Sequence, residues 1–327
     1  MAAFHDVAAF DRAALMTVDP ETMLPSGGLV EGFDPEYCAP FWDSELLDPD
    51  FNKFTDLARS VDGVATLEDA VDGDLGRSPR YQKLYSGLGT PDELRVAFVA
   101  GTSCLAVGVF LRPAGMGPYA GDELTAVRHL RPLATNALRR ALGRIHDAAN
   151  RRPPTVVMLD GSGAITGMST GARQMLDDLR GDIDAGELPA IVAAAATKAR
   201  WSRAAVNLTT RVQGRSGEWL RLHVTPMEGE AGPVAMTIEP ARPDDLVRVL
   251  LESYGLTQRE TEIVLLLARG LSTKEIAAEL IISAHTVRDY VKSIYDKAGV
   301  NSRGELVARL FSNHVLNRFH SAVLHRG

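Results

Sequence analysis

The chain has 327 residues, 45% of them apolar and 24% charged, and its 42 acidic and 35 basic side chains give a formal net charge of −7. This composition excludes intrinsically disordered, collagen-like and disulfide-scaffold proteins, and the length suggests about two domains at ~150 residues each. Two cysteines are too few for a disulfide framework or a four-ligand zinc site. Taken alone, the net acidity argues against a nucleic-acid partner.

Neither a leader nor a membrane span is predicted. The N-terminal sequence has no basic leader, and Asp6 and Asp11 interrupt its apolar residues. We therefore expect no secretory signal. The longest uncharged run, residues 96–111, is shorter than the ~20 residues that cross a bilayer. Together with the scarce cysteines, these features predict a soluble protein of the reducing cytoplasm with no membrane partner.

The first segment, residues 1–152, mixes helical and strand patterns. Its Ala-rich beginning predicts a helix, and two β-branched runs around Gly101 predict a buried hairpin over 94–111. From Asp122 to about Asn150, apolar residues recur at helical spacing and predict a long helix. Its arginines favour the solvated face of a dimerisation helix, with a second nucleic-acid patch as the alternative.

The second segment, residues 153–243, alternates strand and helix patterns in the order β-β-α-α-β-β-β, which predicts an α+β domain with an antiparallel sheet. Within it, Gly167-Met-Ser169-Thr-Gly171 matches a nucleophile elbow, and His223 follows in hydrolase order. A hydrolase sheet needs repeated βα units, which so short an antiparallel domain lacks. We therefore interpret Ser169 as a helix-capping residue and predict no catalytic residue, no metal site and no evident cofactor.

A few side chains have more than one interpretation. The tryptophans, Trp42, Trp201 and Trp219, are expected as core anchors, although they could line a sensory pocket. Cys38 and Cys104 are expected as buried free thiols rather than redox sensors.

The third segment, residues 244–327, consists of helix start and stop signals. Thr257 to Glu260 and Ser272 to Glu275 are capping boxes, and Ser283 and Gly299 bound a further helix. A fourth helix is predicted from Ser302. The segment is therefore an all-α domain of four helices.

The two middle helices describe a helix-turn-helix with a polar, basic outer face on 284–298. Arg288 and Lys292 lie four residues apart, so both point the same way. Arginine can donate twice to guanine, and the acidic Asp289 can accept from a cytosine amine. Hydroxyls at the helix N-termini suit phosphates. The alternative is a small helical core with a solvated charged face.

This stretch resembles the LuxR/FixJ-type DNA-binding domain over about 60 residues, in the motifs LT-x-RE, G-LS-x-KEIA-x-L, IS-x-HTV and K-x-GV-x-SR. The resemblance implies a four-helix domain that binds a two-fold-related site as a dimer. In this sequence a tyrosine, Tyr290, stands where the family usually has histidine. The predicted DNA-binding residues are Thr273, Lys274, Ser283, His285, Thr286, Arg288, Asp289, Lys292, Lys297 and Arg303.

The first two segments resemble, less closely, a GAF-type domain and a PAS-type domain. The resemblance is carried by FWDSELLDPDFNKFTDLARS and the 94–111 strand pair, and then by VVMLDGSGAI, GARQML and GEWLRLHV. It implies two α+β sensory or dimerising domains, in the layout of actinobacterial transcriptional regulators. The resemblance allows a small-molecule effector to bind in either domain, but no residue identifies that effector.

Charge is unevenly distributed along the chain. Residues 245–327 hold 11 basic and 9 acidic side chains, against 24 and 33 in residues 1–244. The sequence thus predicts a cytoplasmic, homodimeric, non-enzymatic transcriptional regulator that binds a double-stranded operator and contacts RNA polymerase. The alternative is a protein-interaction regulator whose helix-turn-helix no longer binds DNA.

Overall fold

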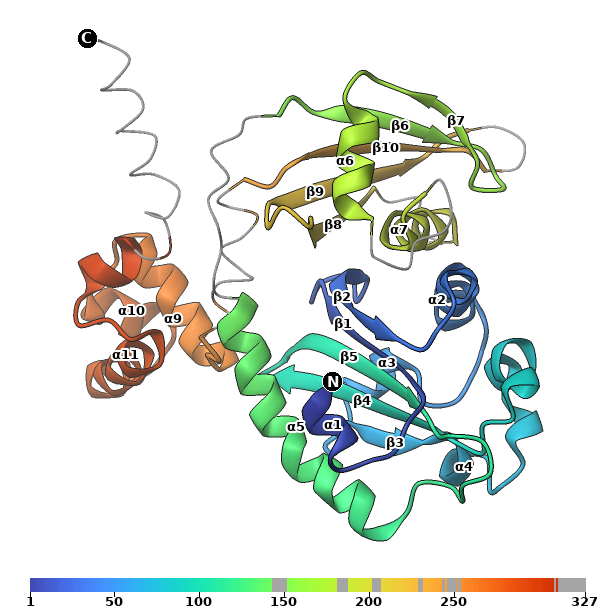
Figure 1. The fold of residues 1–327 in the computed structure, drawn as a ribbon. Helices are drawn as coiled ribbons and strands as arrows, with labels where there is room; N and C mark the ends of the chain where they lie inside the picture. The colour runs from blue at the N-terminus through green and yellow to red at the C-terminus, as the bar shows by residue number, and fades with distance from the viewer. Residues whose placement is uncertain are drawn as a thin grey trace. The chain divides into compact units, whose positions relative to one another are not determined.

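The computed structural model describes residues 1–142, 152–180, 188–201, 207–228, 232–242, 245, 251, 254–308 and 310. The chain divides into two compact units (Figure 1). One unit holds two β-sheets with their helices. The other holds the C-terminal helices, the 100–103 turn and the C-terminal part of helix α5 (Gly121–Leu142).

The first sheet has the strand order β2-β1-β5-β4-β3. Its strands are β1 (Arg12–Val18), β2 (Pro25–Glu31), β3 (Val64–Thr66), β4 (Glu93–Ala100) and β5 (Ser103–Leu111). The predicted hairpin is confirmed as β4 and β5, which are buried along most of their length, as expected for central strands. Gly101 takes a φ of +61° in the turn between them, a conformation that glycine adopts at little cost.

The predicted N-terminal helix is wrong beyond its first residues. Only Ala2–His5 is helical, and RAALMTV forms β1, which pairs with β2 on one side and with β5 on the other. Alanine favours helices only weakly, and this pairing buries Ala14, Met16 and Val18 within the sheet. Tertiary contacts therefore override local propensity here.

Short helices surround this sheet. They are α1 (Ala2–His5), α2 (Cys38–Leu47), α3 (Phe54–Leu57), α4 (Leu67–Ala70), the 3-10 turns η1 (Pro35–Tyr37), η2 (Leu75–Arg77) and η4 (Ser86–Leu88), and the π-helical turn η3 (Tyr81–Tyr85). The long helix α5 is confirmed up to Leu142, and its predicted end lies outside the described residues. Arg131 of α5 donates to the carbonyl of Ala97 in β4 at 3.2 Å, and Leu124 and Val127 are buried.

A buried cluster of charges lies beside the first sheet. The carboxylate of Glu93 accepts from Arg80 at 2.7 Å and from Arg95 at 3.0 Å, and Arg95 also donates to Glu45 at 2.8 Å. Burial alone would raise the pKa of Glu93, but the two arginines lower it below its ordinary value. Burial, followed by the Glu93 charge, raises the pKa of Tyr85, whose hydroxyl donates to Glu93 at 3.3 Å. The phenol of Tyr85 is therefore neutral.

The second sheet is fully antiparallel in the order β7-β6-β10-β9-β8, which confirms the predicted β-β-α-α-β-β-β pattern. Helices α6 and α7 cover one face of it (Figure 1). Its elements are β6 (Thr155–Leu159), β7 (Ile165–Met168), α6 (Ala172–Leu179), α7 (Ala190–Trp201), β8 (Leu208–Gln213), β9 (Trp219–Pro226) and β10 (Val234–Pro240).

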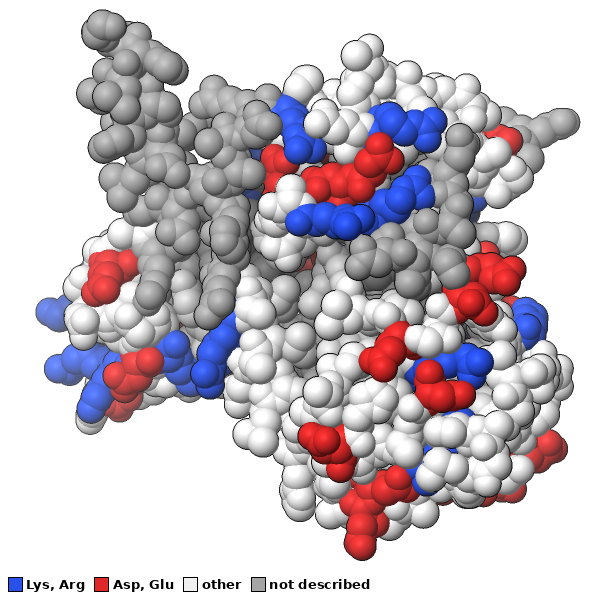
Figure 2. Space-filling model, viewed as in Figure 1, with Lys and Arg blue, Asp and Glu red and all other residues white. Residues whose placement is uncertain are grey.

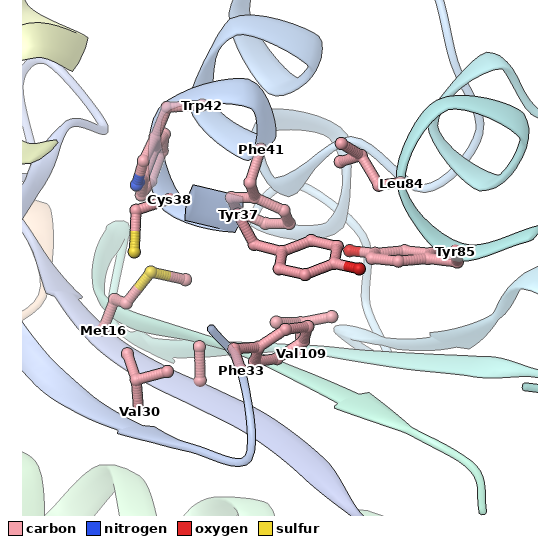
Figure 3. A pocket seen from close by; sticks show the side chains of 11 residues that line it. Met16, Val30, Phe33, Tyr37, Cys38, Phe41, Trp42, Leu84, Tyr85 and Val109 are labelled. Carbon is pink, nitrogen blue, oxygen red and sulfur yellow. The ribbon is translucent and has the colours of Figure 1, made fainter. Parts of the chain in front are cut away.

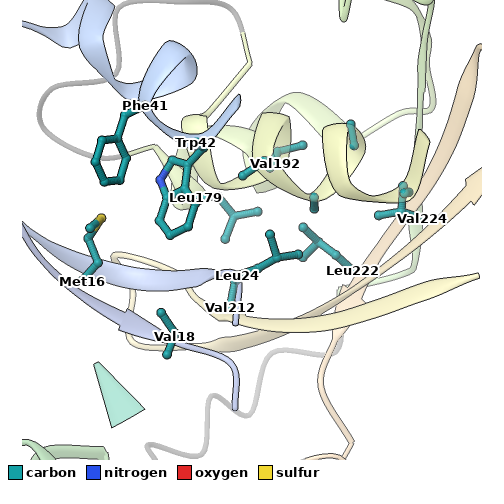
Figure 4. Packing of buried hydrophobic residues seen from close by; sticks show 14 of the residues in the cluster. Met16, Val18, Leu24, Phe41, Trp42, Leu179, Val192, Val212, Leu222 and Val224 are labelled. Carbon is teal, nitrogen blue, oxygen red and sulfur yellow. The ribbon is translucent and has the colours of Figure 1, made fainter. Parts of the chain in front are cut away.

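Both sheets contribute to one buried hydrophobic cluster, in which Trp42 and Leu24 of the first sheet region lie near Val192 and Val212 of the second (Figure 4). Polar contacts join the same regions. Asp19, which is fully buried, accepts from the backbone N–H of Arg211 at 3.0 Å and from its guanidinium at 2.9 Å. The two sheets therefore pack as one unit.

The expectations for tryptophan and cysteine are confirmed in part. Trp42 and Trp219 are buried, but Trp201 is 69% exposed and is no core anchor, because it stands at the end of α7. Cys104 is buried, and burial raises the pKa of its thiol to about 12, so it is not thiolate at neutral pH. Cys38 is half-buried.

Candidate nucleic-acid interface

Three described helices form the predicted helix-turn-helix region: α9 (Gln258–Ala268), α10 (Thr273–Glu279) and α11 (Ala284–Ala298). Both predicted capping boxes are present, with Thr257 and Glu260 bonded reciprocally at the start of α9, and Ser272 and Glu275 at the start of α10. Ser283 caps α11 by accepting from the N–H of Thr286 at 3.0 Å. Further helical residues follow from 303, where the fourth helix was predicted.

The turn from α10 to α11 begins with a Schellman motif. The N–H of Ile282 donates to the carbonyl of Ala277 at 3.0 Å, and that of Ile281 donates to Ala278 at 3.4 Å. Ile281 takes a φ of +55°, a conformation that suits glycine and strains a β-branched residue. Its side chain is 92% exposed. Thus the turn depends on backbone bonds rather than on burial of Ile281.

The helices share a small apolar core. Ile263 in α9, Ile276 in α10, and Val287 and Ile294 in α11 are all fully buried. The spacing of Val287 and Ile294, seven residues apart, places both on the same face of α11. The opposite face of α11 is left to solvent, as the sequence predicted.

A carboxylate joins α9 to α11. The side chain of Glu260 accepts from Lys297 at 2.8 and 2.6 Å and from the hydroxyl of Ser293 at 2.7 Å. Burial alone would raise the pKa of Glu260, but hydrogen bonds from Lys297 and Ser293 outweigh it and hold the pKa at about 2. Ser293 therefore faces α9 and does not belong to the outer face of α11.

The outward face of α11 carries His285, Arg288, Asp289 and Lys292, and all four are exposed. Arg288 donates to the carbonyl of Ala284 at 3.2 Å, and His285 lies 3.3 Å from Asp289 one turn away. Figure 2 shows basic side chains gathered over these C-terminal helices, with acidic ones among them. This face is a cationic stripe along one helix, interrupted by the carboxylate of Asp289.

The remaining predicted residues lie around this stripe in different settings. Lys274 is exposed, and Thr273 and Thr286 are half-buried near helix N-termini. Arg303 donates to the carbonyls of Leu271 and Leu267 at 2.9 and 2.5 Å and so closes the end of α9. Arg303 and Lys297 thus have structural partners, which the sequence motifs did not disclose.

Arg259 is a functional candidate that the sequence did not single out. Its guanidinium donates to the carbonyl of Leu280 at 2.7 Å and to Glu262 at 2.7 Å, so it ties α9 to the end of α10. The capping box around it signals a helix start but says nothing about this contact. Arg259 therefore positions the turn that precedes α11.

The residues weighed for catalysis have other partners. The hydroxyl of Ser169 accepts from the N–H of Val156 at 2.8 Å. The residue before α6 is Gly171, and no side chain caps this helix, so Ser169 is not the predicted cap. His223 contacts Thr209 at 2.9 Å and Glu239 at 3.5 Å. Among the described residues, no group of His, Cys, Asp and Glu is arranged to hold a metal ion. No helix in the described ranges has the length and hydropathy that crossing a membrane requires.

Comparison with known proteins identifies the C-terminal region. Residues 254–310 match the family described as bacterial regulatory proteins, luxR family. The chain is 46% identical over 57 residues to a probable HTH-type transcriptional regulator, GfsR, of Streptomyces halstedii, and 51% identical over 53 residues to the transcriptional activator protein ExaE of Pseudomonas putida. These matches span 17% and 16% of this chain, and only about a quarter of each relative, 24% and 25%.

A shorter relative is covered more fully. The spore germination protein GerE of Bacillus subtilis is 46% identical over 55 residues, which make up 17% of this chain and 74% of GerE. The solved structure of Escherichia coli SdiA covers 94% of this chain and 84% of its own at 14% identity, but its TM-score of 0.27 supports no argument. On the match to residues 254–310 and the coverage of GerE, the chain belongs to the luxR family of bacterial regulatory proteins.

Proposed function

We propose that this protein is a sequence-specific, DNA-binding transcriptional regulator whose α11 enters the major groove. The observation that carries the proposal is the exposed stripe of Arg288 and Lys292 on a helix whose other face is anchored to α9 by Glu260. A rigidly held helix with exposed cationic side chains can present them to base edges and phosphates together.

Each residue of the stripe has a chemical role in this proposal. Arg288 donates to a guanine in the major groove, and Lys292, on the same side one turn later, neutralises a phosphate. Asp289 accepts from a cytosine amine or rejects bases that offer only acceptors. Ser283 and Thr273, at helix N-termini, bind backbone phosphates through hydroxyl and N–H groups.

The rest of the chain supplies control in this proposal. Residues 1–152 act as a GAF-like domain and 153–243 as a PAS-like domain, which sense a small molecule and set the geometry of a homodimer. The support is the pair of antiparallel sheets with helices on their faces, packed through one core. The DNA-binding domain, 244–327, then binds a two-fold-related operator in the cytoplasm and contacts RNA polymerase.

Binding to genomic DNA fragments at rising salt tests the proposal. A protein that neutralises phosphates loses affinity steeply as the salt concentration rises, because the release of counterions from the DNA then contributes less free energy to binding. We expect retarded fragments at low salt, competition by a minority of genomic fragments only, and loss of the complex at high salt. The absence of any retarded fragment at low salt would contradict the proposal.

The second candidate is a protein-interaction regulator that does not bind DNA. Two observations favour it: the exposed carboxylate of Asp289 in the middle of the stripe, and the 92% exposed Ile281 in the turn before α11. An acidic group repels phosphates, and an exposed apolar side chain suits a protein surface. Asp289→Ala separates the candidates, because it would raise non-specific DNA affinity in the first and would not create DNA binding in the second.

A further inference from the structure

A cavity opens between the first sheet and the helices beside it (Figure 3). Eleven side chains line it, from β1, β2, the loop after β2, η1, α2, η3 and β5, and five of these side chains are aromatic. The space open to the centres of water-sized molecules is about 40 Å³. A single water needs about 10–15 Å³ by this measure, so the cavity already has room for several heavy atoms.

None of the described side chains that line the cavity is charged. Apolar groups such as Phe33, Val30 and Val109 make up most of its wall, and the sulfur atoms of Met16 and Cys38 face it (Figure 3). An ion that entered would lose its hydration and meet no opposite charge. The cavity therefore selects against charged ligands.

Two tyrosines add polarity at one end, where Figure 3 shows the hydroxyls of Tyr37 and Tyr85. The hydroxyl of Tyr85 is committed to Glu93 in the buried charge cluster. By contrast, the hydroxyl of Tyr37 has no hydrogen-bond partner in the described part of the chain. It can donate to or accept from a ligand that reaches this end.

One wall of the cavity is shared with the joint between the sheets. Phe41 and Trp42, on α2, line the cavity and also belong to the buried cluster that extends to Val192 in α7 (Figures 3 and 4). Asp43 of α2 accepts from Thr197 of α7 at 3.0 Å. A ligand that displaces α2 would therefore also disturb its contact with α7.

We propose that this cavity is the effector site, and that its ligand is a slender, neutral and largely apolar molecule with a single hydroxyl or carbonyl group. The apolar chain fills the space between Met16, Phe41 and Val109, and the polar group bonds to the hydroxyl of Tyr37. This inference rests on the proposed sensory role. The test measures ligand binding to the protein without DNA. A failure of ligand binding can therefore be told apart from a failure of DNA recognition.

Linear alcohols from 1-butanol to 1-octanol are the probes, and the matched carboxylates from butanoate to octanoate are the comparison. The full chain carries Trp201→Phe, which removes the exposed tryptophan and leaves two buried ones, Trp42 at the cavity and Trp219 in β9 away from it, so that a fluorescence change on binding is assigned to Trp42. We expect saturable changes whose affinity rises roughly threefold to fourfold per methylene until the cavity is full. The carboxylates should bind at least tenfold more weakly, because the cavity offers no counter-charge.

Two variants locate the site. Val30→Phe fills the cavity from β2 and should weaken alcohol binding at least tenfold, while Val61→Phe, at a 99% exposed position, should leave it unchanged. Tyr37→Phe should weaken the alcohols about threefold to tenfold and leave the matched chloroalkanes unaffected. If Val30→Phe does not fold, Tyr37→Phe still decides. The proposal is overturned by equal affinity for alcohols and carboxylates, by binding that does not saturate, or by alcohol binding that neither Val30→Phe nor Tyr37→Phe weakens.

Discussion

Lys297 of α11 donates to both carboxylate oxygens of Glu260 in α9, at 2.8 and 2.6 Å, across 37 positions of sequence. The same carboxylate closes the capping box of α9 with Thr257. One side chain therefore starts one helix and fixes the orientation of another. This contact gives Lys297 a structural role, whether or not it also meets a phosphate.

Replacing Glu260 by glutamine should destabilise the packing of α11. The neutral amide cannot form an ion pair with the ammonium of Lys297, and losing this buried, charge-assisted bond costs about 1–3 kcal/mol. Hydrogen exchange of the α11 amides in the full chain measures this as faster opening. Glu279→Gln, at an exposed position on α10, is the control and should change exchange little. Equal effects of the two variants would show that the Glu260 contact contributes nothing.

The same contact predicts a pH dependence. The pKa of Glu260 is held at about 2 in the folded protein, below its ordinary value of 4.5. A lowered folded pKa contributes stability above the unfolded value, and this contribution is lost as pH falls from about 4.5 towards 2. The difference in α11 opening between wild type and Glu260→Gln should therefore be full at pH 6 and shrink below pH 4. A difference that stays constant down to pH 3 would contradict this assignment.

Relief of the strained turn should stabilise the helix-turn-helix. Left-handed backbone costs a β-branched residue about 1–2 kcal/mol, and Ile281 buries almost nothing in return. Glycine gives back about 0.5–1 kcal/mol through its flexible unfolded state, so Ile281→Gly should gain up to about 1 kcal/mol. Slower exchange of the α10 and α11 amides would report this gain. Val61→Gly, at an exposed position without positive φ, should instead be neutral or destabilising.

The joint between the two sheets should depend on Asp19. This fully buried carboxylate accepts from two backbone groups of its own turn, Glu21 and Thr22, as well as from Arg211. Asp19→Asn removes the buried charge partner of the Arg211 guanidinium, which keeps only the more exposed Glu21 at 2.7 Å, and should cost about 3 kcal/mol. Urea unfolding followed by tryptophan fluorescence measures it. Asp11→Asn, at an exposed ion pair, should cost less than about 1 kcal/mol, and a similar loss in both variants would contradict the role of Asp19.

Local chemistry made the C-terminal helices predictable. A hydroxyl residue followed three positions later by glutamate predicts the start of a helix. Both predicted capping boxes are present, at Thr257 and at Ser272. The second sheet was predictable for a similar reason, because its strands alternate and its turns contain glycine. In each case the signal lies within a few residues of the structure that it specifies.

Contacts between residues far apart in the chain could not be predicted from local sequence patterns. Strand β1 pairs with β5 about 95 positions away, and Asp19 meets Arg211 across 192 positions. No local pattern distinguishes a lysine that is exposed to bind a phosphate from one that forms an ion pair within the protein. Lys297 and Lys292 therefore looked equivalent in the sequence. The exposure of Trp201 likewise depends on where α7 ends.

Selection of binding sites from random DNA with the full chain, beside Arg288→Ala and Lys292→Ala, tests the central claim most directly. We expect the wild type to enrich a two-fold-related motif. Arg288→Ala should lose about 1–3 kcal/mol and accept other bases at one position of each half-site, while Lys292→Ala should weaken all sequences alike and lower the salt slope by about one. Lys83→Ala, outside the helical unit, should match the wild type. Failure of the wild type to enrich any motif would contradict DNA recognition by α11.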